Sequence, residues 1–362
     1  MEPATAAKHR LYKRYLDAWW PILLQPTPGK GYLRPRVTYV DAFAGPGIYE
    51  AGEEGSPVFA LDRLLKHQLV KRMNLSRDRV HLIFLEKDRR RHEHLCKVLE
   101  DRFGELSCLP VSVHPLHGEA GSATLPALTD LSAWGHPILG VFDSWGSVKV
   151  PLNVIQRIAH NRSSEVLVTF GPNWFSRREA LNEEHFDAVF GGREFWSPAE
   201  REVRPDEKWR VWLNTYRDAL RRAGFKYQLQ FKVVPRTGLP LYLVYGTNHE
   251  KGVEVMKEAM WSVDGEGGLG FEDPRTRGAV PEGQLTLWSG IGMAEPELIE
   301  LVLQRLDDGP VTLEGLGEWL LLETARWRRQ DARRAVTELL KTGSATQESP
   351  GRLQRTSVIR RR

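Results

Sequence analysis

An acidic residue followed by a glycine turn is the first group in the chain whose residue types could do chemistry. Asp41 follows the apolar stretch 37–40, and Gly45 and Gly47 come shortly after it. This pattern is typical of a buried parallel strand that runs into a tight turn, where glycine lets the backbone approach a ligand closely. In doubly wound folds, ligands bind at the carboxyl ends of the strands. We therefore expect this turn, Phe43 included, to form the floor of a nucleotide-type pocket.

The composition of the turn restricts the ligand. A phosphate loop needs Gly-Lys followed by Ser or Thr, and residues 45–57 contain no lysine. The dinucleotide motif needs a third glycine where this chain has Glu50, and the surrounding acids would repel a pyrophosphate. A cationic or zwitterionic ligand fits better. We therefore expect S-adenosylmethionine, which carries a sulfonium and an ammonium group and no phosphate. The alternative is a plain strand–turn–helix connection without a ligand.

Acids also follow the next two predicted strands. Glu86 lies in the stretch 80–88, where the acid at the end of the second strand binds ribose hydroxyls in Rossmann-like sites. It comes 45 residues after Asp41 instead of about 20, so we expect an insertion between the two motifs. Glu119 follows the stretch 107–116, and its position suits an acceptor for the adenine amino group of the cofactor.

Asp143 and Trp145 lie at the end of the fourth predicted strand, 137–146. Enzymes that methylate amino groups place an acid here, which accepts a hydrogen bond from the target amine, and an aromatic residue, which stacks on the base. We predict these catalytic roles for Asp143 and Trp145. Ser144 stands where a proline is expected. The alternative that stays open is that Asp143 caps the backbone ahead of the helix 151–162.

A parallel sheet covered by helices would bring these residues to one edge. Predicted strands alternate with helices, and a hairpin closes the series, so we predict an α/β fold with a Rossmann-like, class I methyltransferase-type seven-stranded sheet. The predicted strands are 37–40, 80–88, 107–116, 137–146, 165–170, 227–234 and 239–245. The predicted helices are 5–24, 58–69, 89–99, 151–162, 208–223 and 250–261.

The sequence divides into two domains and a linker. Residues 1–262 are assigned to the methyltransferase-like domain, which includes the N-terminal helix and an aromatic-rich insertion at about 173–208. This insertion is either a substrate lid whose aromatic rings stack on bases or a small helical cap with its own core. Residues 263–288 are rich in Gly, Asp, Glu and Pro, which indicates a linker. Residues 289–362 are predicted to form a small winged-helix domain.

The predicted winged-helix domain is strongly basic. Residues 325–362 contain eleven Lys or Arg and three Asp or Glu, a net charge of +8 in a chain whose total is +4. Helices are predicted at 297–306, 313–322 and 326–341, and a β-wing at 344–359. Such folds lay the third helix in the major groove, where arginines contact phosphates and make affinity salt-dependent. The candidates are Arg326, Arg328, Arg329, Arg333, Arg334, Arg352 and Arg355. Protein contacts with a solvated arginine face are the alternative, and the clustering favours nucleic acid.

Overall composition bounds the class of protein. Hydrophobic residues make up 41% and charged residues 27%, as in soluble globular proteins, and no apolar run approaches the ~20 residues that span a bilayer. The basic N-terminus has no apolar core, so no secretory signal is expected. The two cysteines lie twelve residues apart with no CxxC motif. We therefore expect a cytoplasmic protein without a metal site or a membrane partner.

Several of these motifs together resemble the three-Cys-motif partner family. They are DAFAGPG at 41–47, EGSP at 54–57, FLEKD at 84–88, HGEA at 117–120 and FDSWG at 142–146. Members of this family are methyltransferase-like proteins encoded beside a three-cysteine protein that is similar to radical S-adenosylmethionine enzymes, so the resemblance implies such a protein as a partner. It covers roughly residues 8–262 and the small C-terminal module. The family usually has DPFG where this chain has Asp-Ser-Trp-Gly at 143–146. This chain therefore lacks a proline that helps to shape the target-amine site in the family.

Two functions are consistent with this pattern. The first is an S-adenosylmethionine-dependent methyltransferase acting on nucleic acid, DNA in preference to RNA, on a base that is flipped out or already unpaired. The second is a catalytically inactive methyltransferase-like protein that binds DNA and serves as the partner of a radical-SAM-type enzyme in DNA repair or modification. A nuclease is not supported, because no cluster of two or three acids at metal-ligand spacing lies outside the predicted pocket.

Overall fold

The structure is a computed structural model that describes residues 2–27, 29, 31, 34–49, 52–177, 182–201, 204–265, 267–272, 294–349 and 351–362. These residues form two compact units. The first comprises the described residues up to 249 together with 271–272. The second comprises the described residues of 250–270 and those from 294 onward. Among the described helices, none combines the length and the apolar character needed to cross a membrane.

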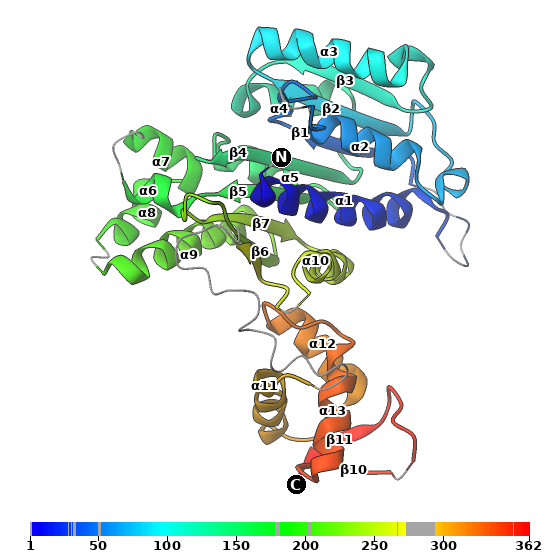
Figure 1. Cartoon of the computed structure of the whole chain (residues 1–362), viewed down its shortest axis with the longest axis vertical. Coiled ribbons are helices and arrows are strands. Elements are labelled where there is room, and N and C mark those ends of the chain that lie inside the picture. Colours follow the sequence, from blue (N-terminus) through cyan, green and yellow to red (C-terminus); the bar gives the residue numbers. More distant parts are fainter. Residues whose placement is uncertain are drawn as a thin grey trace. The chain divides into compact units, whose positions relative to one another are not determined.

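The first unit is built around an eight-stranded sheet with the order β3-β2-β1-β4-β5-β7-β6-β8 (Figure 1). The strands are β1 (Val37–Asp41), β2 (Val80–Glu86), β3 (Ser112–His117), β4 (Ile138–Gly146), β5 (Glu165–Phe170), β6 (Tyr227–Val234), β7 (Leu241–Thr247) and β8 (Gly270–Glu272). Strands β1 to β5 are parallel, and β7 is antiparallel to β5 and β6. The α/β fold with its closing hairpin is confirmed. The predicted count of seven strands is wrong, because the three-residue β8 lies in a glycine-rich stretch that resembles a linker.

The strand register explains why the predicted pocket residues meet. Strands β1, β2 and β5 are buried at every position, as expected for parallel strands covered on both faces. Asp41 is opposite Phe84 of β2 and Val141 of β4. The carboxyl ends of these strands therefore lie at one edge. Strand β1 has β2 on one side and β4 on the other, which is the reversal point where doubly wound folds bind ligands.

Helices surround this sheet, and Figure 1 shows their arrangement. They are α1 (Pro3–Leu24), α2 (Ser56–Leu65), α3 (Arg89–Phe103), α4 (Ala120–Asp130), α5 (Leu152–Ala159), α6 (Pro172–Ser176), α7 (Glu183–Phe190), α8 (Arg193–Glu200) and α9 (Pro205–Ala223). Helix α1 packs against α2, and α5 packs against α9. Helix α2 has Gly55 as its N-cap and a proline in its first turn. It ends at Leu65, four residues earlier than predicted.

Helix α1 is anchored to the sheet by a buried polar cluster. The Tyr15 hydroxyl donates to Glu165 Oε2 at 2.5 Å and lies 2.8 Å from the Tyr245 hydroxyl, which donates to Glu165 Oε1 at 2.8 Å. Thr247 Oγ1 also donates to Glu165 Oε1. This cluster ties α1 to β5 and β7. The helix continues through Pro21 to Leu24, as the predicted range 5–24 requires.

The aromatic-rich insertion forms a core. Phe175, Phe186, Phe190 and Trp196 are at most 2% exposed and pack around Trp212 of α9. They belong to the same hydrophobic cluster as the side chains that cover the sheet. These four rings are therefore not available to stack on bases. Trp174 and Phe195 of the same insertion are 39% and 37% exposed, and the buried rings join the core of the sheet instead of forming a core of their own.

The second unit contains four helices and a small sheet. Its elements are α10 (Glu250–Val263), α11 (Pro296–Asp307), β9 (Val311–Thr312), α12 (Leu313–Glu323), α13 (Asp331–Thr342), β10 (Ala345–Gln347) and β11 (Val358–Arg361). The sheet order is β10-β11-β9. Trp261 of α10 shares a core with Leu298, Leu320 and Trp327, so α10 groups with these elements, although we predicted it as the last helix of the main domain. The predicted linker 263–288 lies outside the described residues except for 263–265 and 267–272.

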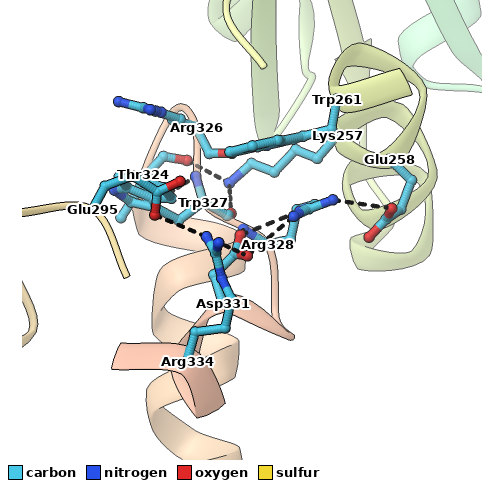
Figure 2. A network of polar contacts seen from close by, with 10 residues as sticks. All are labelled: Lys257, Glu258, Trp261, Glu295, Thr324, Arg326, Trp327, Arg328, Asp331 and Arg334. Carbon is cyan, nitrogen blue, oxygen red and sulfur yellow. Dashed lines mark hydrogen bonds and ion pairs between the residues drawn. The ribbon is translucent and has the colours of Figure 1, made fainter. Parts of the chain in front are cut away.

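Lys257 connects α10 to the carboxyl end of α12 (Figure 2). Its buried Nζ donates to the carbonyl oxygens of Leu320 (3.2 Å), Leu321 (2.6 Å), Thr324 (2.6 Å) and Trp327 (2.8 Å). The last carbonyls of a helix have no partner inside the helix, and this ammonium group serves several of them. Burial lowers the pKa of Lys257 to about 7. An ammonium group offers three N–H donors to these oxygens, whereas a neutral amine would direct a lone pair at one of them.

Candidate functional site

A cavity of about 1000 Å³ lies at the carboxyl ends of the parallel strands β1 to β4. Six of the eight residues predicted for the cofactor and the acceptor line it. They are Phe43, Gly45, Glu86, Glu119, Asp143 and Trp145. The other two, Asp41 and Gly47, are sequence neighbours of lining residues but do not line the cavity themselves.

Glu86 is held in place by backbone groups from two loops. Its Oε2 accepts a hydrogen bond from the Gly45 N–H at 2.9 Å, and its Oε1 accepts one from the Asp88 N–H at 2.8 Å. Each carboxylate oxygen has two lone pairs, so both oxygens can accept a further hydrogen bond. A carboxylate with this fixed orientation at the wall of a cavity is suited to binding two neighbouring hydroxyl groups.

The two glycines of the turn have different roles. Gly45 and Gly47 have φ angles of +64° and +81°, as the predicted tight turn requires. A Cβ at position 47 would come within 3.0 Å of Leu95 and 3.1 Å of Val98 on α3. Gly47 therefore lets the turn pack closely against α3, while Gly45 presents its backbone to the cavity.

Asp41 lies beneath the turn and is 1% exposed. Its Oδ1 accepts a hydrogen bond from the Phe43 N–H at 3.2 Å, which fixes the start of the turn. Burial raises the pKa of Asp41 to about 6, while Ser56 and the Phe43 amide act in the other direction. In this structure Asp41 shapes the turn from below and has no face on the cavity.

The raised pKa of Asp41 predicts a pH-dependent effect of its replacement. Between pH 4 and pH 6 the folded protein binds more protons at this site than the unfolded chain, so stability falls as pH rises. The variant Asp41→Asn lacks this titration. Its free energy of unfolding, relative to the wild type, should therefore increase by about 2–3 kcal/mol from pH 4 to pH 7.5. Denaturant unfolding of both proteins at both pH values measures this, and a pH-independent difference would contradict it.

Asp143 is paired with a lysine of the first helix. Its Oδ2 accepts from Lys8 Nζ at 2.7 Å and from the Tyr12 hydroxyl at 3.3 Å, and its Oδ1 is buried. Burial acts to raise the pKa of Asp143, but Lys8, together with hydrogen bonds from Thr169 and the Trp145 amide, outweighs burial and holds the pKa below the ordinary value. Lys8 Nζ also lies 4.7 Å from the centroid of the Trp145 ring. The Lys8 ammonium thus takes the position predicted for the target amine beside Asp143, and it also lies over the ring predicted to stack on the base.

Trp145 lies exposed in the irregular carboxyl-terminal part of β4. It is 57% exposed, its φ angle is +58°, and the pairing of β4 with β5 shifts register between Phe142 and Gly146. A left-handed conformation in a residue other than glycine costs about 1–3 kcal/mol and is typical of functional sites. The Trp145 carbonyl accepts from Trp174 Nε1 at 3.2 Å, and Ser144, which stands where a proline was expected, is buried.

Four of the seven predicted nucleic-acid-binding arginines form ion pairs within the second unit. The pairs are Arg326–Glu297 (2.7 Å), Arg328–Asp331 (3.1 Å), Arg329–Glu318 (3.2 Å) and Arg334–Glu295 (2.9 Å). Figure 2 shows those of Arg328 and Arg334. The Arg328 guanidinium also lies 4.1 Å from the centre of the Trp261 ring. These side chains help to hold the unit together. Arg333, Arg352 and Arg355 are exposed.

The third helix of this region starts later than predicted. It begins at Asp331 instead of 326, so Arg326, Arg328 and Arg329 precede it. The reason lies in the preceding loop, where Trp327 is 4% exposed and the fully buried Asp331 accepts hydrogen bonds from the Arg328 backbone and side chain. Over the described part of the chain, no group of three or more His, Cys, Asp or Glu could hold a metal ion.

No family model matches the chain, and no curated protein matches it either. Similar solved structures include Trm1 from Pyrococcus horikoshii with S-adenosyl-L-methionine, at 10% identity and a TM-score of 0.37, covering 97% of this chain and 90% of that one. EvdMO1 is 14% identical with a TM-score of 0.34 over 70% of this chain, which spans only 42% of EvdMO1. The hMettl16 catalytic domain in complex with MAT2A 3'UTR hairpin 1 is 10% identical, with a TM-score of 0.30, over 64% of this chain and 67% of that one.

Proposed function

We propose that this chain is an S-adenosylmethionine-dependent methyltransferase-like protein that acts on nucleic acid. The observation that carries the proposal is Glu86, whose carboxylate is oriented by two backbone N–H groups at a cavity beside a glycine turn. We assign Glu86 to the ribose hydroxyls, the turn with Phe43 and Gly45 to the amino-acid part of the cofactor, and the exposed Glu119 to the adenine amino group. The two cysteines, both free, are consistent with a reducing cytoplasm.

Titration calorimetry with S-adenosylmethionine and S-adenosylhomocysteine tests the cofactor site. We expect micromolar binding by the wild type. The variant Glu86→Gln should bind about 10–100-fold more weakly, because a hydrogen bond to a charged acceptor contributes about 1.5–3 kcal/mol. Glu93→Gln removes an exposed acid of α3 outside the cavity and should bind like the wild type. A folded wild-type protein that binds neither compound would refute the proposal.

Trp145 is proposed to stack on the target base, which must be unpaired or flipped out to reach the cavity. Methyl transfer mainly requires that the acceptor is aligned with the methyl group. For Asp143 to orient a target amine directly, Lys8 must leave Oδ2, since Oδ1 is buried. The role of Asp143 in catalysis therefore depends on whether the contact with Lys8 opens.

The Lys8 contact also favours a second function. A site whose amine position is filled by its own lysine fits a catalytically inactive, DNA-binding partner of a radical-SAM-type enzyme, as the resemblance to the three-Cys-motif partner family implies. Incubation with methyl-labelled S-adenosylmethionine and single-stranded DNA or RNA separates the two functions. Label on the nucleic acid supports the enzyme. Binding of cofactor and nucleic acid without transfer supports the partner.

We also propose that the described residues from 294 onward form a winged-helix module that binds DNA in preference to RNA. Three helices followed by strands β10 and β11 support this arrangement. Because four of the candidate arginines are ion-paired, we assign the phosphate contacts of the module to the exposed residues Arg333, Arg352 and Arg355.

The variant Arg352→Gln/Arg355→Gln tests the module. Each lost phosphate contact lowers the log–log salt slope for duplex DNA by about 0.9, so we expect the slope to fall by about 1.8 and the affinity to drop. The matched control is Arg360→Gln/Arg361→Gln, which removes two arginines of the same module that are paired with Glu348 and Asp307. Fluorescence anisotropy on duplex DNA and RNA measures both variants. An equal effect in the control would show that general charge, and not these two arginines, sets the affinity.

A further inference from the structure

One wall of the cavity is basic. The residues that make it so, at the end of β2 and in the first turns of α3, are Lys87, Arg90, Arg91 and His94, and Lys149 after β4 also lines the cavity. All five are exposed. Among the residues that the structure describes, neither Arg90 nor Arg91 has an ion-pair partner, whereas the adjacent Arg89 pairs with Glu93 at 3.0 Å. This wall therefore presents free cationic groups to the cavity.

The carboxylates of the cavity do not neutralise this wall. Asp143 is already paired with Lys8, so two acids, Glu86 and Glu119, remain to balance the basic side chains. Four lysine and arginine side chains line the same cavity, twice the number of these two acids. The proposed cofactor does not account for them. It carries no phosphate, and its one carboxylate group can pair with one of them, while its own sulfonium adds positive charge.

Exposed aromatic rings line the cavity together with the cationic groups. Trp145 and Tyr49 are 57% and 40% exposed. Free cationic groups next to exposed aromatic rings are the combination that binds single-stranded nucleic acid, because phosphates contact the cations and bases stack on the rings. A duplex does not offer unstacked bases to such rings.

We infer that Lys87, Arg90 and Arg91 bind the phosphate backbone of single-stranded nucleic acid and thereby bring a base to Trp145. This inference rests on the proposed function, because it identifies the polymer contact of the same site. It differs from the interpretation of the sequence, which assigned phosphate contacts to the C-terminal arginines alone. The first unit binds the strand that carries the target base, and the winged-helix module is a separate contact.

The variant Arg90→Gln/Arg91→Gln tests this inference in the full-length protein. A labelled single-stranded oligonucleotide, as DNA and as RNA, is titrated by fluorescence anisotropy at several salt concentrations. Loss of two phosphate contacts should lower the log–log salt slope by about 1.4 and weaken binding about tenfold at low salt. The matched control is Lys71→Gln/Arg72→Gln. These two exposed residues precede β2 and lie toward the amino ends of the strands, so the same loss of charge should leave binding unchanged.

Calorimetry with S-adenosylhomocysteine on the wild type separates this inference from the proposed function. If the wild type binds S-adenosylhomocysteine and Arg90→Gln/Arg91→Gln binds the oligonucleotides as the wild type does, the inference is overturned and the cofactor site stands. If the wild type binds oligonucleotides but no S-adenosylhomocysteine, the proposed function fails, and the two arginine variants still decide the inference. Equal weakening by both variants, or a wild type that binds neither oligonucleotide, also overturns it.

Discussion

Replacing Lys8 by methionine should lower the free energy of unfolding of the first unit by about 3–5 kcal/mol, because Asp143 would become a largely buried carboxylate with no cation beside it. The Lys8 and Asp143 side chains are only 5% and 20% exposed, so water does little to compensate. Denaturant unfolding measures the change. A Lys8→Met variant as stable as the wild type would show that the ion pair contributes nothing.

A second variant and a pH series sharpen this prediction. The double variant Lys8→Met/Asp143→Asn also removes the negative charge of Asp143 and should therefore recover most of the lost stability. Lys8 holds the pKa of Asp143 below its ordinary value, so the pair stabilises the fold above about pH 4 and loses this effect as Asp143 becomes protonated. The difference between wild type and Lys8→Met should therefore shrink in acid. A double variant no more stable than Lys8→Met alone would contradict the explanation.

Replacing Lys257 by methionine should destabilise the second unit by a similar amount, about 3–5 kcal/mol. Four carbonyl groups at and beyond the end of α12 would lose their common donor. The Leu320 carbonyl keeps the Thr324 hydroxyl, and each of the other buried carbonyls left without a partner costs about 1–3 kcal/mol. Hydrogen–deuterium exchange should show loss of protection in α10 and α12.

A matched lysine on the same helix provides the control for Lys257. Lys251 pairs with Glu254, and its side chain is 60% exposed. Exposed ion pairs of this kind contribute at most about 1 kcal/mol, so Lys251→Met should leave exchange in α12 unchanged. Wild-type protection of α12 in Lys257→Met would mean that packing, and not the ammonium group, holds the helix end.

The strand ends could be predicted from the sequence because their signals are local. Asp41 and Glu86 each end an apolar run, and parallel strands bring their carboxyl ends to one edge, so both acids lie beside the cavity. The glycine turn was predictable for the same reason. Strand β8 was not, because its three residues lie in a glycine-rich stretch and owe their structure to the neighbouring strand.

Contacts between residues distant in sequence could not be predicted. Asp143 and Lys8 are 135 residues apart, and no sequence motif around either residue indicates that the two form a pair. One signal was present, because Lys8 is one helical turn before Tyr12 and therefore shares the buried face of α1. The arginines show the same limit. The sequence gives their number, but only the fold places Glu297, Glu318 and Glu295 beside Arg326, Arg329 and Arg334.

The anchoring of α1 also has a consequence for synthesis of the protein. Tyr15 bonds to Glu165 and Tyr245, which the ribosome adds 150 and 230 residues later. At about 5–20 residues per second, roughly 10–50 seconds pass before the last of these partners exists. Trp20 finds Tyr39 of β1 only 19 residues later, but the part of α1 around Tyr15 has no β5 or β7 to pack on during that time. The nascent chain therefore carries an amphipathic helix whose apolar face is only partly covered, which is a natural binding site for chaperones at the ribosome.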